Sequence, residues 1–372
     1  MSGDGTVIAV GAWQNDDNGI NSGHVRIFKF SPSANQWVQR GADLIGESAG
    51  DLSGVSIAMA TNGDVVAIGA NEANVPNHGN AGHVRVFEWN EVSWVQRGTD
   101  IDGIGGVDFG ISVALSDDGS ILAVGDRYSG LNGANSGSVN AFVWTGADFQ
   151  QRGSQLIGQA AGDQFGISVS LSSDGGIMVV GAIYNDVGGT DSGQVRAFTW
   201  TGTLWQQLGS AIQGQNPSDE SGLGISLSND GRTVAIGSRW NDNGVGQDAG
   251  HVRIFELVGS MWQPKGPAIL GDNPGDNSGL SAALSADGEV VAIGSIYHDG
   301  VGSNSGQVRI FIWDAVSGVW IQRGPSLLGG AVDDWFGWAV ALSEDGRTVA
   351  ASGRLNDARG ERAGLVQVFQ WF

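Results

Sequence analysis

The chain of 372 residues has no cysteine, only seven prolines and only two lysines. The lack of cysteine excludes a disulfide framework, a thiolate metal site and thiol catalysis. No apolar run approaches the roughly 18 residues of a membrane-spanning helix, and no secretory hydrophobic segment is present, so we expect no direct membrane insertion. Because Met1 lies inside a repeat described below, we expect the chain to be a fragment, and an export signal could have preceded it.

Positive charge is also scarce. The chain has 39 acidic and 18 basic residues, a formal net charge of −21. A field of this sign repels phosphate backbones and anionic lipid, so nucleic acid and a bare membrane surface are not expected partners. Cations and neutral polar ligands are compatible with it.

Glycine, in contrast, is abundant, with 63 residues. Seven glycines end an Asp-Gly or Asn-Gly turn at spacings of 58, 56, 56, 56, 57 and 58 residues, namely Gly5, Gly63, Gly119, Gly175, Gly231, Gly288 and Gly346. A period that runs over the whole length is typical of one supersecondary unit copied end to end. We therefore predict a single domain, residues 1–372, of seven repeats with 56–58 residues each.

The third repeat shows the strand pattern of one unit. Residues 109–116 alternate small and large side chains, and the turn at 117–119 leads into the apolar run 121–125; the runs 138–144 and 149–153 follow. We name these strands A, B, C and D. Four antiparallel strands repeated seven times predict an all-β protein, a seven-bladed β-propeller with four-stranded antiparallel blades. A β-solenoid is the alternative, although it would have shorter coils and no four-stranded meander.

The first and last repeats are incomplete. The sequence contains seven B and seven C strands but six A and six D strands, because it begins at strand B and stops after the C strand at 366–371. Unpaired strand edges favour pairing with another chain. We therefore expect either an imperfect meeting of the two ends, or strands supplied by further sequence or by a partner, with self-association as one outcome.

Two short motifs recur at fixed places: Phe-Gly at the start of strand A and Gly-Ala at the end of strand B. Phe165-Gly166 with Gly181-Ala182 is one instance, and Phe109-Gly110 and Phe336-Gly337 begin two further A strands. The pairing resembles the FG-GAP repeat of integrin-α-like propellers. That resemblance implies a seven-bladed propeller for adhesion and ligand binding, at the cell surface or outside the cell. Some members bind calcium in an Asp-rich A–B loop, but the A–B loops here, such as residues 172–175, are tight hairpins, so we do not carry those sites over.

Two series of acidic residues fall on one face, because strand direction alternates and the B–C and D–A loops emerge on the same side. The D–A loops carry an Asp just before Phe-Gly or Ser-Gly, at Asp51, Asp108, Asp163, Asp219, Asp276 and Asp334. The B–C loops carry one at an equivalent position, at Asp16, Asp186, Asp242, Asp299 and Asp357. One interpretation is that these carboxylates accept backbone N–H bonds and hold their loops. The other is that they bind a cation, with calcium as the candidate cofactor.

Aromatic residues mark the same face. One equivalent B–C position carries Tyr128, Tyr184, Trp240 and Tyr297. A flat ring beside Asp and Asn suits a sugar, whose C–H face packs on the ring while polar groups hold its hydroxyls. The alternative is that these rings pack between blades. We expect such packing for the strand D tryptophans, which recur at Trp37, Trp94, Trp205, Trp262 and Trp320.

Strand C carries a recurring arginine, which we expect to point outward or to pair with loops, at Arg26, Arg85, Arg196, Arg253 and Arg309. The last B–C loop adds Arg354, Arg359 and Arg362 to the acidic face, in the repeat that also holds Trp335 and Trp338. A basic and aromatic notch of this kind suits an anionic sugar or a carboxylate of a partner. The alternative is that its arginines pair with neighbouring acids.

No Ser-His-Asp or Cys-His set stands out, and the carboxylates recur almost equivalently, whereas acid–base catalysis needs one differentiated constellation. We therefore expect no enzymatic activity. The sequence favours a binding or adhesion module that presents an acidic, aromatic loop face to a glycan or protein ligand, with calcium as a candidate aid. A structural assembly protein joined through incomplete blades is the alternative, and a glycan-directed hydrolase or lyase comes third.

Overall fold

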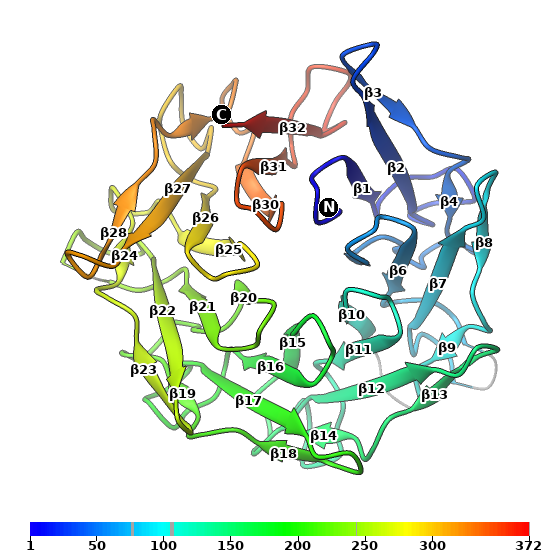
Figure 1. Cartoon of the computed structure of the whole chain (residues 1–372), viewed down its shortest axis with the longest axis horizontal. Coiled ribbons are helices and arrows are strands. Elements are labelled where there is room, and N and C mark those ends of the chain that lie inside the picture. The colour runs from blue at the N-terminus through cyan, green and yellow to red at the C-terminus, as the bar shows by residue number, and fades with distance from the viewer. Residues whose placement is uncertain (76–77, 105–107, 243, 372) are drawn as a thin grey trace. The chain divides into compact units, whose positions relative to one another are not determined.

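A computed structural model describes residues 1–75, 78–104, 108–242 and 244–371. The elements of regular structure in these ranges are all β-strands, and no helix there is long and apolar enough to cross a membrane. The strands form seven antiparallel sheets, one for each repeat, which is the fold class of a seven-bladed β-propeller (Figure 1). The predicted fold class is confirmed.

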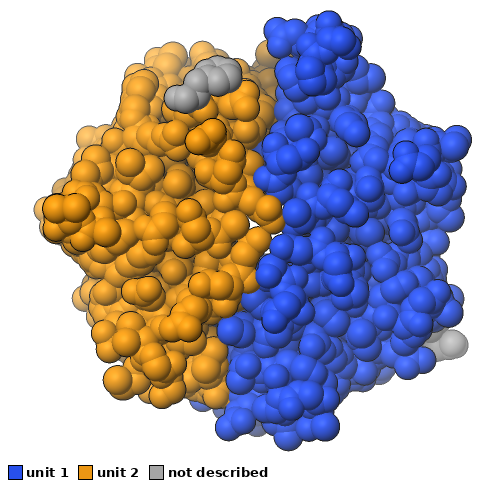
Figure 2. Space-filling view, viewed as in Figure 1, with its two compact units in different colours: residues 1–182, 198–206 blue, residues 183–197, 207–372 orange. Residues whose placement is uncertain are grey.

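Two compact units make up the chain (Figure 2). Unit 1 comprises residues 1–182 and 198–206, and unit 2 comprises residues 183–197 and 207–372. A single domain over residues 1–372 stays a prediction. Each contact described below lies within one unit.

Strands B and C are the regular elements of every repeat. The B strands are six residues long throughout: β1 Val7–Ala12, β6 Val65–Ala70, β11 Ile121–Asp126, β16 Ile177–Ala182, β21 Thr233–Ser238, β26 Val290–Ser295 and β31 Thr348–Gly353. The C strands are β2 His24–Ser31, β7 His83–Trp89, β12 Ser138–Trp144, β17 Gln194–Trp200, β22 His251–Val258, β27 Gln307–Asp314 and β32 Leu365–Gln370.

The described residues contain six A strands and six D strands, as predicted. The A strands are β5 Ser56–Met59, β10 Phe109–Leu115, β15 Phe165–Leu171, β20 Ile225–Leu227, β25 Ser278–Leu284 and β30 Phe336–Leu342. The D strands are β3 Gln36–Gln39, β8 Trp94–Gln96, β13 Phe149–Gln151, β18 Trp205–Gln207, β23 Met261–Pro264 and β28 Val319–Gln322. Recruitment of a partner to the incomplete blades stays a prediction.

Six further strands of two residues each were not predicted. They are β4 Leu44–Ile45, β9 Ile101–Asp102, β14 Leu156–Ile157, β19 Ile212–Gln213, β24 Ile269–Leu270 and β29 Leu327–Leu328. In the third repeat, strand D pairs with the second half of strand C, Phe142 with Gln151, while β14 pairs with its first half, Val139 with Leu156. The short strand thus covers the part of strand C that strand D leaves free, and it leads the chain into the D–A loop.

The A–B turns are the tight hairpins that the sequence predicts. In the fourth repeat, Ser172 Oγ donates to Asp174 Oδ1 at 2.7 Å, and the backbone N–H of Gly176 donates to the same oxygen at 2.8 Å. The hydrogen bond from Ser172, followed by that from Gly176, lowers the pKa of Asp174. Gly175 has φ +61°, a value that favours glycine. The Asp side chain therefore stabilises the turn itself.

A close approach between neighbouring repeats explains the glycines of the Phe-Gly and Gly-Ala motifs. A Cβ added to Gly69, in strand B of the second repeat, would lie 2.1 Å from the carbonyl oxygen of Gly110, in strand A of the third. A Cβ added to Gly294 would likewise lie 2.0 Å from the carbonyl oxygen of Gly337. Because these distances leave no room for a side chain, the motif marks the place where successive sheets touch by their backbones.

The apolar core lies between successive sheets. One cluster joins Val86 of the second repeat to Val124 of the third, and another joins Val308 of the sixth to Val349 of the seventh. The strand D tryptophans bridge the same gaps, as predicted: Trp94 Nε1 donates to the carbonyl of Arg40, one repeat earlier, at 2.7 Å. Burial of such side chains, at about 25 cal/mol per Å², is the main source of stability.

Strand C arginines of later repeats cross the same gaps. Arg85 donates from Nη2 to the carbonyl of Ile45 at 2.6 Å, and Arg309 donates to that of Leu270 at 2.6 Å. These two side chains are buried, with 7% and 4% exposure, so they do not point outward. They do pair with loops, the other expected placement, since Arg85 forms an ion pair with Glu47 and Arg309 with Asp272. Arg26 is exposed and pairs with Asp43. Because the acceptor carbonyls belong to short strands β4 and β24, which sequence reasoning missed, the inward role of the arginines was missed too.

Candidate aromatic binding site

The five B–C aspartates each close their own loop. One carboxylate oxygen of Asp16, Asp186 and Asp299 accepts the backbone N–H five residues later, at 2.8 Å in all three loops. Asp242 accepts the N–H of Asp248 at 2.9 Å, and Asp357 accepts that of Arg362 at 2.6 Å. All five side chains are exposed. Within the described ranges, no cluster of three close metal-ligating side chains includes any of them.

The D–A aspartates are buried and hold their loops in a similar way. Asp163 Oδ2 accepts the N–H groups of Gln159 and Ala160, and Asp334 Oδ2 accepts those of Gly330 and Ala331. The other oxygen of Asp334 accepts Asn356 Nδ2 at 2.9 Å, a bond to the following B–C loop. These contacts fit the loop-holding interpretation of this series.

Asp108 does not belong to that series. A non-glycine residue with positive φ directly precedes Phe-Gly or Ser-Gly in six repeats: Leu52, Asp108, Gln164, Glu220, Asn277 and Trp335. The buried loop-holding aspartates precede this position by one residue, whereas Asp108 occupies it. We refer to it below as the positive-φ position.

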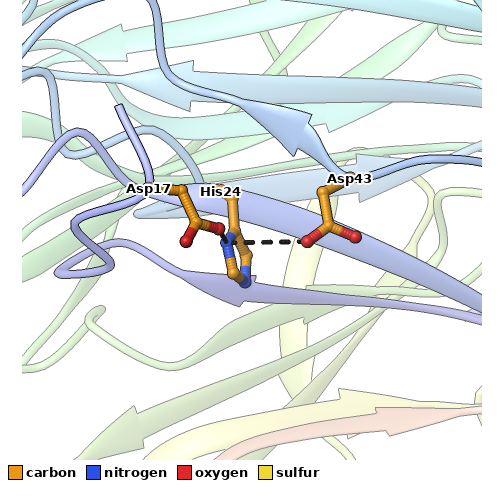
Figure 3. Close-up of side chains that lie close together, drawn as sticks. All are labelled: Asp17, His24 and Asp43. Atoms are coloured by element: carbon orange, nitrogen blue, oxygen red, sulfur yellow. Dashed lines mark hydrogen bonds and ion pairs between the residues drawn. The ribbon is translucent and has the colours of Figure 1, made fainter. Parts of the chain in front are cut away.

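Three other groups bring a histidine together with two carboxylates. In the first repeat His24 Nδ1 lies 2.9 Å from Asp17 Oδ2 and 4.0 Å from Asp43 Oδ2, as Figure 3 shows. The second group is Glu47, His83 and Asp100. Each group offers three ligand atoms within 4.8 Å of one another, which is a partial cation site at most, since calcium takes six to eight oxygens.

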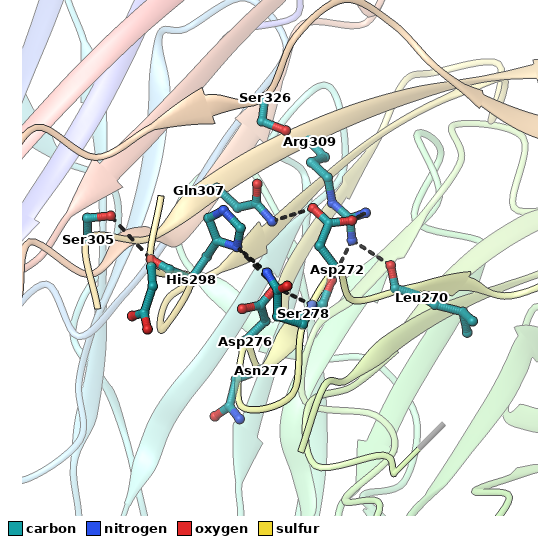
Figure 4. A network of polar contacts seen from close by, with 12 residues as sticks. Leu270, Asp272, Asp276, Asn277, Ser278, His298, Ser305, Gln307, Arg309 and Ser326 are labelled. Atoms are coloured by element: carbon teal, nitrogen blue, oxygen red, sulfur yellow. Dashed lines mark hydrogen bonds and ion pairs between the residues drawn. The ribbon is translucent and has the colours of Figure 1, made fainter. Parts of the chain in front are cut away.

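The third group, Asp272, Asp276 and His298, is already joined to an arginine network (Figure 4). Asp276 Oδ2 lies 3.1 Å from His298 Nδ1, and Asp272 Oδ2 accepts Gln307 Nε2 at 2.9 Å. Asp272 also forms an ion pair with Arg309. Asp272 thus connects the D–A loop to strand C of the next repeat, and Asp276 connects it to the B–C loop of that repeat.

The four B–C aromatics are all partly exposed, but their surroundings differ. The guanidinium of Arg127 lies 4.6 Å from the ring centroid of Tyr128. Trp240 donates from Nε1 to Glu220 Oε2 at 2.9 Å, beside Arg239. Tyr184 is the third ring. Only the fourth, Tyr297, is among the residues lining a pocket described next.

A shallow pocket of about 450 Å³ opens beside Tyr297 in unit 2. Its apolar surfaces come from Tyr297, Trp335 and Pro274, and its polar groups include Asp299 and Asn304. The Tyr297 and Trp335 rings meet edge to face, with centroids 5.4 Å apart and planes inclined by 82°. Two ring surfaces at nearly a right angle therefore form a corner of this pocket, which we call the aromatic pocket.

Arg354, from the basic and aromatic notch of the last B–C loop, lies near the same aromatic pocket. Trp335 stacks on Trp338 with centroids 5.9 Å apart, and the guanidinium of Arg354 lies 4.3 Å from the Trp338 centroid and 5.9 Å from that of Trp335. Burial lowers the pKa of Arg354, and the nearby charge of Arg362 lowers it further. Arg359 and Arg362 are exposed, and neither side chain forms an ion pair with a described residue. The structure thus brings Tyr297 and Arg354, which the sequence placed in separate candidate sites, to the same indole, Trp335.

One differentiated carboxylate pair occurs in the third repeat, and sequence reasoning missed it. Asp126 ends strand β11, where other B strands end in Ala, Ser or Gly, and it is only 5% exposed. Burial, with a smaller contribution from the charge of Asp108, raises the pKa of Asp126 to about 7. Asp108 itself forms an ion pair with Arg127 and accepts a hydrogen bond from Asn71 Nδ2. Only the replacement of a small residue by Asp126 signals this pair in the sequence.

Comparisons with known proteins agree with the fold. The FG-GAP repeat family matches residues 158–198, which contain Phe165-Gly166 and Gly181-Ala182. Together with the seven sheets, this match identifies an FG-GAP-like seven-bladed propeller. No curated protein matches the chain.

Among solved structures, the chain is similar to a protein from Bacteroides fragilis described as "a putative 6-phosphogluconolactonase". The two are 13% identical, with a TM-score of 0.63, over 99% of this chain and 91% of that one. At this identity the likeness shows the fold alone.

Proposed function

We propose that the chain is a non-enzymatic binding module and that it takes a glycan in the aromatic pocket. The observation that carries the proposal is the corner formed by Tyr297 and Trp335 over a volume of about 450 Å³. This volume lies within the roughly 300–1,000 Å³ of small-ligand sites, which combine aromatic walls with a few polar groups. The C–H face of a pyranose would pack on one ring, and Asp299 and Asn304 would accept and donate hydrogen bonds to its hydroxyls.

The absence of catalysis is part of the proposal. The carboxyl whose pKa is raised to about 7, Asp126, is 5% exposed, and its neighbour Asp108 is 4% exposed, so a substrate does not reach them. At the aromatic pocket, Asp299 accepts the N–H of Asn304, and Asp333 accepts the side-chain amide of the same residue. These carboxylates support loop structure, and they suit binding better than proton transfer.

The setting of the module follows from its resemblance to adhesion propellers. We place it at the cell surface or outside the cell, where it would attach to a glycan or to a glycan-bearing protein. Calcium remains part of the proposal as an aid, because the five B–C aspartates are exposed and each uses one oxygen in its loop.

The test is a glycan array followed by calorimetry on the variant Trp335→Ala. We expect binding of at least one glycan class by the native chain and a loss of about tenfold or more in the variant, since one aromatic contact contributes about 1 kcal/mol or more beyond its buried area. Tyr128→Ala is the matched control, because Tyr128 occupies the position of Tyr297 in another repeat and lies beside Arg127. Silence of the whole array, or equal loss in both variants, would refute the proposal.

A further inference from the structure

Three positions of the repeat meet beside the start of strand C. They are the first residue of strand C, the residue just before the two-residue strand of the same repeat, and the residue two places after the two-residue strand of the preceding repeat. In the third repeat Gln155 Nε2 donates to Ser138 Oγ at 2.7 Å, which joins the first two positions. In the sixth repeat Gln307 Nε2 donates to Asp272 Oδ2 at 2.9 Å, which joins the first position to the third (Figure 4). We call these three positions the junction triad.

The junction triad of the second repeat consists of a histidine and two acids. His83 begins strand β7, Asp100 directly precedes β9, and Glu47 follows β4 by two residues. The four other complete triads, in order along the chain, are Ile104 with Ser138 and Gln155, Gln159 with Gln194 and Ala211, Gln215 with His251 and Ala268, and Asp272 with Gln307 and Ser326. None of these four combines an imidazole with two carboxylates, so the second repeat is distinct in its chemistry.

The imidazole of His83 is buried and lacks the partner that comparable histidines have. The residue is 4% exposed, and its Nε2 has no hydrogen-bond partner among the described residues. In the two other groups of one histidine and two acids, Nδ1 of His24 lies 2.9 Å from Asp17, and Nδ1 of His298 lies 3.1 Å from Asp276. No such ion pair joins His83 to a carboxylate of the described chain. A buried polar group without a partner is unfavourable, so this imidazole is suited to a ligand from outside the chain.

The two carboxylates of this triad each have an oxygen to spare. Glu47 Oε1 lies 3.4 Å from Arg85 Nη1, and Asp100 Oδ1 accepts Gln96 Nε2 at 2.6 Å. Neither Glu47 Oε2 nor Asp100 Oδ2 forms a hydrogen bond with a residue in the described ranges. Glu47 is exposed, so solvent reaches the triad from its side.

The geometry and the ligand types suit a zinc ion. Glu47, His83 and Asp100 each offer one ligand atom, and these atoms lie within 4.8 Å of one another. A point within about 2.8 Å of all three therefore exists, and an inward movement of less than about 1 Å by each side chain would reach the 2.0–2.2 Å of zinc to nitrogen and carboxylate oxygen. An imidazole with two carboxylates is typical of zinc, whereas calcium takes six to eight oxygens. Three protein ligands leave the fourth position of a tetrahedral zinc to water.

We propose that Glu47, His83 and Asp100 bind a zinc ion that links the first repeat to the second. Glu47 belongs to the loop after β4 of the first repeat, whereas His83 and Asp100 belong to the second, so the bound ion is a cross-link between two successive sheets. The net charge of −21 raises the local concentration of cations at such a site. This inference goes beyond the proposed function and is independent of it, since these three residues belong to unit 1 and the aromatic pocket to unit 2.

The experiment is a calorimetric titration of the full chain with Zn²⁺ after chelator treatment, together with melting curves with and without the ion. The variant is His83→Gln, because glutamine occupies this position in β17 and β27. The matched control is His251→Gln: His251 is also buried and its Nε2 also lacks a partner among the described residues, but its triad has no carboxylate. Asp100→Asn is a second variant, which removes a ligand from a half-buried position.

We expect the native chain and His251→Gln to bind zinc with equal affinity and to melt at a higher temperature in its presence, because the ion binds the folded state. His83→Gln and Asp100→Asn should each weaken zinc binding by about tenfold or more, since even changes outside the ligand set cost about that much. A native chain that binds no zinc would overturn the inference. So would equal zinc affinity in the native chain and His83→Gln, an equal loss in His83→Gln and His251→Gln, or displacement of the zinc by an equal concentration of calcium.

Discussion

Replacement of Asp126 by Asn should stabilise the protein at neutral and alkaline pH and have little effect in acid. Asp126 is 5% exposed, its Oδ1 has no hydrogen-bond partner among the described residues, and burial together with the charge of Asp108 raises its pKa from 3.8 to about 7. An Asp whose pKa is raised on folding binds its proton more tightly in the native state. The unfolding free energy therefore falls as pH rises from about 4 to about 7, and the loss is complete above pH 7.

The size of the effect follows from the shift. Three pKa units correspond to about 4 kcal/mol, and relaxation around the charged pair reduces this, so we expect a gain of about 2–4 kcal/mol for Asp126→Asn at pH 8. Asparagine has the shape of the protonated acid, and its carbonyl still accepts the N–H groups of Tyr128 and Ser129 that lower the pKa of Asp126. Arg127 and Asn71 contact Asp108 and are left in place.

The assay is urea unfolding followed by tryptophan fluorescence at pH values from 4 to 9, with Asp102→Asn as a control for the loss of one formal charge from an exposed strand residue. The difference between Asp126→Asn and the native chain should be near zero at pH 4 and should grow through pH 7. A difference that is constant with pH, or a carboxyl resonance of Asp126 that titrates near pH 4, would refute the reasoning.

Three further predictions test other features of the molecule. His251 is 1% exposed and burial lowers its pKa to about 4, so the unfolding free energy should fall by about 2–3 kcal/mol as pH drops from 6.5 to 4. Glutamine occupies the same position in β17 and β27, and His251→Gln should remove this pH dependence in acid unfolding experiments. Gly69→Ala should lower the unfolding free energy by about 2–4 kcal/mol in urea unfolding, because its Cβ would lie 2.1 Å from the Gly110 carbonyl oxygen. Gly244→Ala is the control, since a Cβ there meets open space and should change the unfolding free energy by less than about 1 kcal/mol. Equal effects of the two substitutions would contradict the backbone contact. If calcium aids binding, titration after chelator treatment should release heat and raise the melting temperature, and Asp299→Asn should weaken both; no heat and no shift would remove calcium from the proposal.

The sequence was sufficient to predict the repeat, the strand types and the hairpins, since each depends on neighbouring residues within one repeat. Alternation in residues 109–116 and the turn at Asp174-Gly175 are local signals, and both recur seven or nearly seven times. The two-residue strands could not be predicted in this way. A strand such as β14 has no period to detect, and its formation depends on the half of strand C that strand D leaves unpaired.

The candidate site was only partly predictable. The sequence singled out Tyr297, Arg354 and Trp335, but assigned the tyrosine to a series of sugar-binding rings and the arginine to a separate notch. Their proximity depends on the D–A loop that carries Trp335 lying against two B–C loops, that of the sixth repeat with Tyr297 and that of the seventh with Arg354. Asp126 and Asp108 were missed as a pair for the same reason, because their residue types are common and only the fold brings them together.

The positive-φ position shows how such a site can arise in a repeat protein. Six different side chains occupy it, from Leu52 to Trp335, with φ between 49° and 87°, so its backbone is fixed by the loop while its side chain is free to vary. An acid there forms an ion pair with the arginine of the following B–C loop, as Glu220 does with Arg239. A tryptophan there leaves the arginine over an indole and adds a wall to the aromatic pocket. The residue at this one loop position therefore differs between an acid that pairs with an arginine and an indole that lines the aromatic pocket. The buried aspartate one residue earlier, unchanged between Asp219 and Asp334, keeps the loop itself constant.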